Sequence, residues 1–182
     1  MSKSSKSPAT TPKSLSDKEV AARNAAALSR IAEMDDPDKL RALMVNAERM
    51  DVVEVRDAAF RRLALVQAEA PEDAPEAGSL DHDLWQTIHA YEQLLREDRG
   101  RFLKLTRTRM RLTKAGAVKA LEGFAAATDE TPGFDVLVTR GLSDLTGEAV
   151  ILRHPDSFDA VTRDAAAARL AKAGADTAPA AT

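Results

Sequence analysis

Residues 81–100, DHDLWQTIHAYEQLLREDRG, carry the clearest helical pattern in the chain. Their apolar side chains recur at helical spacing on one face, which consists of Leu84, Ile88, Tyr91 and Leu95 with Trp85 and Leu94 beside it. Asp81 or Asp83 is expected to cap the start of this helix, and Gly100 suits the left-handed residue that often follows a helix end. The segment therefore predicts a helix that packs through this face and stops at Gly100.

Three further helices are predicted before this segment, over residues 17–69. Ser16 with Glu19 forms a capping-box pattern, and Asp36 followed by Pro37 marks the start of a second helix. The apolar stripe restarts at Val52, which predicts a third helix packed antiparallel on the second as a hairpin over 37–69. No second copy of this hairpin follows in the sequence, so a solenoid is not expected.

The acidic stretch APEDAPEAGS, residues 70–79, separates these helices from the rest of the chain. Its two prolines, three acidic residues and one glycine are typical of a linker, so we place a subdomain boundary there. The two ends of the chain, 1–16 and 174–182, are rich in small and polar residues and bury little apolar surface, so both are expected to be disordered tails.

The C-terminal unit, 80–173, is predicted to contain several short helices and one extended element. Gly116 divides two helical patterns, an arrangement compatible with a helix-turn-helix. A helix is expected at 157–173, capped by Asp156 or Ser157, whereas 148–153 has a strand-like apolar run. The predicted fold class is mainly α: a helical bundle of two small subdomains with one minor β element, in which the C-terminal unit resembles a helix-turn-helix.

The segment 96–119 stands out by its charge. It contains nine basic residues and two acidic ones, a net charge of +7, while the chain as a whole has a formal net charge of −3. The remaining residues therefore sum to −10. Such a local excess is a modest indication of a polyanionic partner, because Lys and Arg neutralising phosphates dominate affinity for nucleic acids.

Eight residues of this segment are candidate phosphate contacts: Arg101, Lys104, Thr106, Arg107, Thr108, Arg109, Arg111 and Lys114. On a helix that starts near 106, Arg107, Arg111 and Lys114 share a face and Arg109 points away, while Met110 and Leu112 are expected to turn inward. The structural alternative is a solvated basic helix neutralised by acidic residues near the linker, namely Glu69, Glu72, Asp73 and Glu76.

The favoured function is therefore nucleic-acid binding, with DNA as the first expected partner and RNA as a second, in a regulatory or accessory role. The alternative is a non-enzymatic protein-protein interaction adaptor that uses the hairpin 37–69. Because Ala-rich helical proteins with few aromatic residues often complete their cores by association, a homodimer is also open.

Catalysis and cofactor binding have no support in the sequence. The chain has no cysteine, no phosphate-binding glycine loop and no nucleophile motif, so no catalytic residue, cofactor or metal is predicted. A metal site at His82 and His89 is the only metal alternative, and His82 is expected to be exposed next to a helix cap. Without a secretory signal or a long apolar run, the expected location is the cytoplasm, away from membranes.

Overall fold

A computed structural model describes residues 16–69, 74–127 and 131–175, and within these ranges it contains helices and no strand. The mainly helical class is thus confirmed. The helices are α1 (Asp17–Ala32), α2 (Pro37–Arg49), α3 (Val53–Glu69), α4 (Leu80–Arg99), α5 (Thr106–Ala125), α6 (Pro132–Thr139), α7 (Gly147–Arg153) and α8 (Ala160–Lys172), with 3-10 turns η1 (Ser143–Leu145) and η2 (Pro155–Ser157). The predicted tails lie almost entirely outside the described residues.

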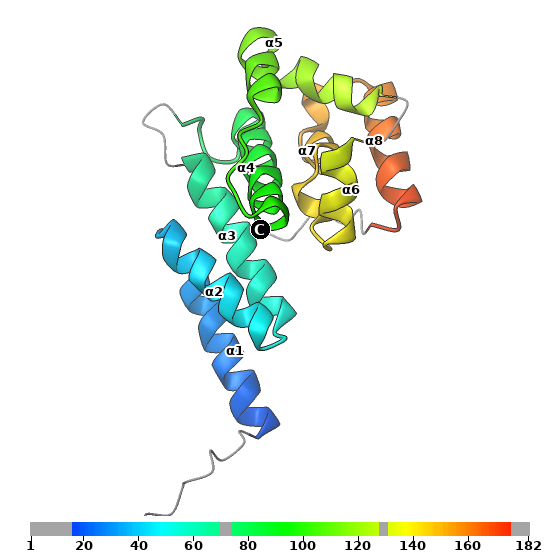
Figure 1. Cartoon of the computed structure of the whole chain (residues 1–182). Helices are drawn as coiled ribbons and strands as arrows, with labels where there is room; N and C mark the ends of the chain where they lie inside the picture. Colours follow the sequence, from blue (N-terminus) through cyan, green and yellow to red (C-terminus); the bar gives the residue numbers. More distant parts are fainter. Residues whose placement is uncertain (1–15, 70–73, 128–130, 176–182) are drawn as a thin grey trace, which may run out of the picture.

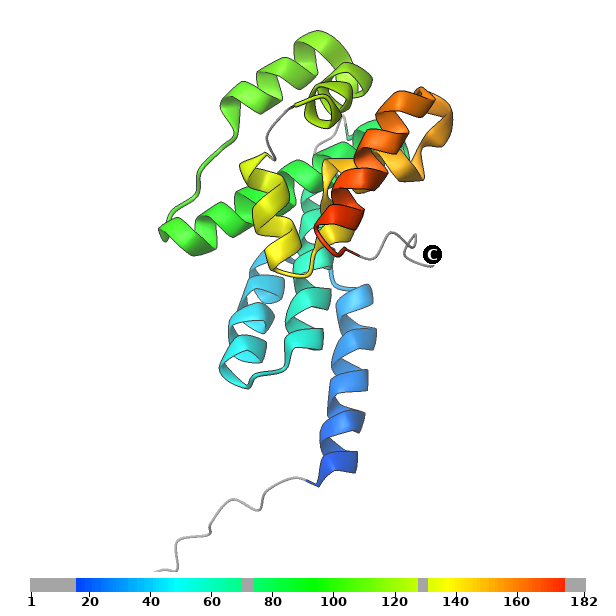
Figure 2. The ribbon, with the colours of Figure 1, turned by 90° about the vertical axis from the view of Figure 1, so that its right-hand side faces the viewer.

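The N-terminal helices begin as predicted. The Ser16 hydroxyl accepts a hydrogen bond from the Glu19 N–H and the Glu19 carboxylate accepts one from the Ser16 N–H, which completes the capping box of α1. Asp36 caps α2, with Pro37 at its first position. Figures 1 and 2 show α1 running away from the other helices, and Ile31 near its end is its one buried residue.

Helix α4 ends as predicted and begins differently. Gly100 adopts the left-handed conformation at φ 65°, as expected. The N-cap is Ser79 rather than Asp81 or Asp83, because the Ser79 hydroxyl accepts from the His82 N–H at 3.2 Å. This earlier start turns His82 into the interior, so the expectation of an exposed His82 is wrong.

The predicted strand at 148–153 is also wrong, because these residues form α7. The Thr146 hydroxyl accepts from the Ala149 N–H at 3.2 Å and so caps a helix there. Gly147, Glu148, Val150 and Ile151 are all buried, because α4, α5 and α8 surround this short helix. A short segment that is buried on every side has the same run of apolar residues in its sequence whether it forms a strand or a helix. The periodicity of the sequence therefore does not distinguish the two structures.

The last helix starts later than predicted. Asp159, not Asp156 or Ser157, caps α8 by accepting from the Thr162 N–H at 2.8 Å, while residues 155–157 form η2. Phe158, just before the cap, is buried against α4, α5 and α7. The proline at the start of 155–157 favours a turn before the helix can begin.

Two clusters of buried side chains meet on α4. The first joins α1, α2 and α3 to Ala90 and Leu94 of α4 and to the segment after α6. The second joins Leu84 and Ile88 of α4 to α5, α7 and α8. Helices from both sides of the stretch 70–79 therefore pack on α4, and Figure 1 shows α3 beside it.

Gly116 divides α5 into two helical pieces, as the sequence predicts. Its φ of 81° and ψ of 166° interrupt the helix. Figure 1 shows the two pieces running in different directions, with the first piece labelled α5 and the yellow-green second piece lying over α6 and α7. This backbone conformation is almost restricted to glycine, because a Cβ atom is strained there.

We expect Gly116→Ala to destabilise the protein by about 1–3 kcal/mol because of this strain. Gly123 is the matched control: it is helical, exposed and has open space where a Cβ would lie. Gly123→Ala should raise stability by about 0.4–1 kcal/mol, since alanine favours the helix. Urea denaturation of the two variants measures both changes, and a neutral Gly116→Ala would contradict the strained kink.

Candidate nucleic-acid interface

The first half of α5 packs antiparallel on α4 through a buried ion pair. Glu92 is 1% exposed, and its carboxylate accepts two hydrogen bonds from Arg109, from Nε at 2.8 Å and from Nη2 at 2.6 Å. The backbone N–H of Leu105 donates a third, at 2.8 Å, to the same carboxylate. Because a buried carboxylate is costly unless it is paired and hydrogen-bonded, these contacts fix where α5 starts and which side faces α4.

Two rings of α4 surround the Arg109 side chain. The guanidinium lies 4.7 Å from the centre of the Trp85 ring, a cation–π contact, and Nη2 is 3.5 Å from Nδ1 of His89. Burial, together with the positive charges of Arg109 and Lys104, lowers the pKa of His89 to about 4, although Glu92 acts in the opposite direction. His89 is thus neutral near pH 7, in a region of positive potential.

The other predicted cations are not paired with α4. Arg101, Lys104, Arg107, Arg111 and Lys114 are exposed, and none of them forms an ion pair with another described residue. The predicted common face of Arg107, Arg111 and Lys114 thus lies in solvent; we call these three residues the basic ridge. Arg109 points inward and pairs with Glu92, so it is not part of the basic ridge.

The two threonines of the candidate set lie on different sides of α5. Thr106 is exposed at the first residue of the helix, beside the basic ridge. Thr108 is half-buried and lines a mostly apolar cavity of about 270 Å³, whose walls include Tyr91, Phe124 and Glu148. Thr106 is therefore accessible to a ligand on the ridge, whereas Thr108 faces the space between α4, α6 and α7.

A groove of about 410 Å³ runs between α4 and the first half of α5. Its lining consists of Trp85, Lys104, Thr106, Arg109, Met110, Thr113 and Lys114. Leu112 is buried as predicted, but Met110 is 53% exposed at the groove, so the expectation that it turns inward is wrong. Lys114 belongs to both the groove and the basic ridge, which makes the two features one continuous surface.

The acidic residues proposed to neutralise the basic segment are placed elsewhere or not described. Glu69, at the end of α3, lies beside His82, with 3.8 Å between Oε1 and Nε2. Glu72 and Asp73 fall outside the described residues. Glu76 is described and exposed, and it forms no ion pair with the basic ridge. Among the described residues, the basic ridge thus has no ion-pair partner.

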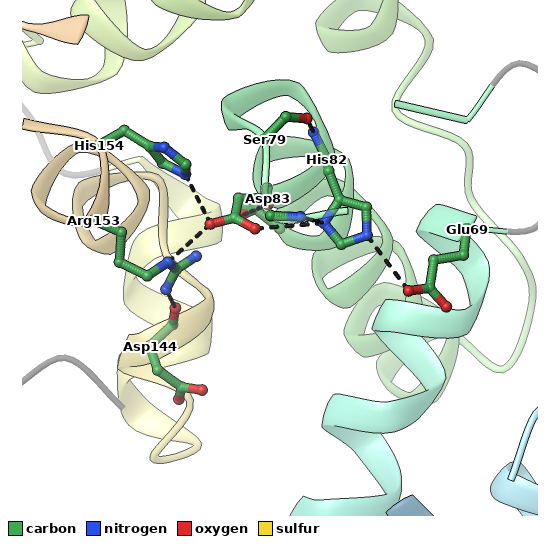
Figure 3. A network of polar contacts seen from close by, with 9 residues as sticks. Glu69, Ser79, His82, Asp83, Asp144, Arg153 and His154 are labelled. Carbon is green, nitrogen blue, oxygen red and sulfur yellow. Dashed lines mark hydrogen bonds and ion pairs between the residues drawn. The ribbon is translucent and has the colours of Figure 1, made fainter. Parts of the chain in front are cut away.

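A second cluster of polar contacts joins the first turn of α4 to α7 (Figure 3). Asp83 Oδ2 accepts from Arg153 Nε at 2.9 Å and from His154 Nε2 at 3.0 Å, while Arg153 also donates to the backbone oxygen of Asp144 at 2.7 Å. Burial raises the pKa of Asp83, but these hydrogen bonds and the charge of Arg153 outweigh it and lower the pKa overall. The cluster ties α7 to α4.

Arg61 extends this connection to the N-terminal hairpin. It holds the Asp144 carboxylate with two hydrogen bonds, of 2.9 and 2.8 Å, and donates to the Gly141 oxygen at 3.2 Å. The histidines contact different partners: His82 faces Glu69, His89 faces Arg109 and His154 faces Asp83. In the part of the chain that the structure describes, no three His, Asp or Glu side chains are grouped to hold a metal ion.

Sequence reasoning missed Trp85 and Glu92 as parts of this surface. One signal was available for Glu92, which continues the apolar row of Leu84 and Ile88 at a spacing of four residues. A carboxylate in such a row is turned toward the interior and needs a cationic partner there. Trp85 carried no such signal, because its place in the groove depends on how α5 packs.

Comparison with protein-family models, with curated proteins and with solved structures finds no match to this chain. No described helix is both long enough and apolar enough to cross a membrane.

We expect Glu92→Ala to destabilise the protein by about 3–5 kcal/mol, because it leaves the Arg109 guanidinium partly buried without its anion. Glu122 of α5 is the matched control: its side chain is exposed and forms no ion pair with a described residue. Glu122→Ala should change stability by less than about 0.5 kcal/mol. Chemical denaturation of both variants compares them, and equal effects would contradict a structural role for the Glu92–Arg109 pair.

The lowered pKa of His89 makes stability depend on pH. Between about pH 4 and about pH 6.5 the unfolded chain binds a proton at this site and the folded protein does not, so stability falls as the pH falls through this window. The change is on the order of 3 kcal/mol. The urea midpoint of the wild type should depend more steeply on pH across this window than that of His89→Gln. Parallel curves for the two proteins would contradict a lowered pKa of His89.

Proposed function

We propose that this protein binds the phosphate backbone of nucleic acids through the basic ridge and the adjoining residues Arg101, Lys104 and Thr106. The observation that carries the proposal is that five exposed cations within 14 residues have no ion-pair partner among the described residues. Unpaired Lys and Arg side chains on one surface are the electrostatic requirement for binding a polyanion.

Arg109 takes a positioning role in this proposal. Its charge is committed to Glu92, with which it forms two hydrogen bonds, so it orients α5 and leaves phosphate contact to the other cations. Thr108 is also left out of the contact surface, because it lines the apolar cavity. DNA is the first partner to test, with a role as a regulatory or accessory factor.

We expect duplex DNA of random sequence to bind with a steep salt dependence. Five phosphate contacts give a log-log slope of about −4.5, a loss of about 500-fold in affinity between about 50 and about 200 mM salt. Fluorescence anisotropy measures this. The variant Arg107→Ala/Arg111→Ala/Lys114→Ala should bind much more weakly, with a slope of about −2.

The matched control removes three cations elsewhere. Lys18→Ala/Arg23→Ala/Arg49→Ala changes the net charge equally, at exposed positions of α1 and α2. It should bind nearly as the wild type does if the ridge is the binding surface. Equal losses in the two triple variants would indicate a non-specific effect of net charge and contradict the proposal.

A second candidate function is the protein-interaction adaptor, which one observation favours. Val45 and Val53 of the α2–α3 hairpin are 66% and 60% exposed, and Met50 between them is 48% exposed. Exposed apolar side chains on one hairpin suit a protein partner. Absence of DNA binding at low salt, together with unchanged stability of the ridge variant, would favour this adaptor function over the first proposal.

A further inference from the structure

The groove beside the basic ridge has apolar and aromatic walls next to unpaired cations. Trp85 and Met110 line it, and Phe102, which is 55% exposed, lies just before it in the chain. Phosphates need only the cations, so these apolar side chains have no use in a contact with the backbone alone. Side chains in these positions suit a ligand that carries both negative charge and an apolar planar surface.

We infer that the groove receives an unpaired nucleobase, so that the preferred partner is a single-stranded nucleic acid. This inference rests on the proposed phosphate binding. It goes further by naming the base as the part of the nucleotide that enters the groove. In a duplex the faces of the bases are covered by stacking, and only phosphates, sugars and base edges are accessible. In a single strand every base offers a free face, on which aromatic side chains stack.

The groove is arranged for stacking before any ligand arrives. The Arg109 guanidinium lies over the Trp85 ring at 4.7 Å and is itself held by the two hydrogen bonds to Glu92. The guanidinium thus covers one face of the Trp85 ring, and because Arg109 itself lines the groove, its planar group is a surface on which a base can stack. Little ordering is left for the ligand to induce, which favours affinity.

The cations of the groove are placed to bind the phosphates on both sides of such a base. Lys104 precedes the first residue of α5 and Lys114 lies near the end of its first half, and both line the groove. At about 1.5 Å per helical residue they are separated by on the order of 12–15 Å along the helix. A short single-stranded segment can therefore lie along the groove with a base between the two lysines.

Trp85 is the one tryptophan of the chain, so its fluorescence reports directly on the groove. We would titrate the full-length protein with oligothymidylate of about ten nucleotides, with an abasic strand of equal length and with a duplex. The base-bearing strand should quench Trp85 and bind about 5- to 150-fold more tightly than the abasic strand, the range for one stacked base. The duplex should bind without quenching.

Oligouridylate and oligodeoxyuridylate differ only in the 2′-hydroxyl, so comparing their affinities tests the sugar, and the tighter of the two indicates whether RNA or DNA is preferred. Met110→Ala tests the groove without touching a charge or the Trp85–Arg109 contact, and it should weaken single-strand binding several-fold while leaving duplex binding unchanged. Met50→Ala is its matched control, a methionine of similar exposure, 48% against 53%, on the α2–α3 hairpin. Met50→Ala should change neither single-strand binding nor duplex binding.

The outcomes separate this inference from the proposed function. If the abasic strand or the duplex binds as tightly as the base-bearing strand, and Trp85 fluorescence stays unchanged, the groove holds no base and the inference is overturned, while phosphate binding by the ridge stands. If none of the strands binds at low salt, the proposed function fails and the inference with it. An acidic peptide that quenches Trp85 when the strands do not would point to a protein partner instead.

Discussion

The position of α5 depends on the carboxylate of Glu92, which is almost completely buried and accepts hydrogen bonds from the Leu105 N–H and twice from Arg109. A buried charge that loses its partners costs several kcal/mol, so any other packing of α5 on α4 is strongly disfavoured. Fixing one face of a helix also fixes the opposite one. Together with the buried Leu112, this interaction sets the direction of the basic ridge and the groove next to it.

Cations of α5 have two different environments, depending on which side of the helix they lie. Arg109, two residues after Arg107 and two before Arg111, points at α4 and is neutralised there, whereas its two neighbours point outward. If the basic segment served only to balance the acidic remainder of the chain, its outer arginines would also have carboxylate partners nearby. The described residues give them none, and this asymmetry is the physical argument for an external anion.

Features set by neighbouring residues could be predicted from the sequence, and features set by packing could not. The capping box at Ser16, the helix end at Gly100 and the break at Gly116 follow from local backbone chemistry, and the structure confirms all three. The prediction of a strand at 148–153 is wrong because the burial of this segment comes from its packing against three other helices. Trp85 became recognisable as part of the candidate surface only from the packing of α5 against α4, whereas Glu92 has one signal in the sequence, its place in the row of Leu84 and Ile88.

We propose that the groove favours a nucleic acid over an acidic protein surface as the partner of the basic ridge. Carboxylates and phosphates satisfy Arg107, Arg111 and Lys114 about equally well in charge, so the ridge alone does not discriminate between them. An acidic protein surface, however, would leave the Trp85 ring and the Met110 side chain without a matching contact. A nucleotide strand carries an anionic backbone and planar rings, so it matches both the cations and the apolar side chains of this surface.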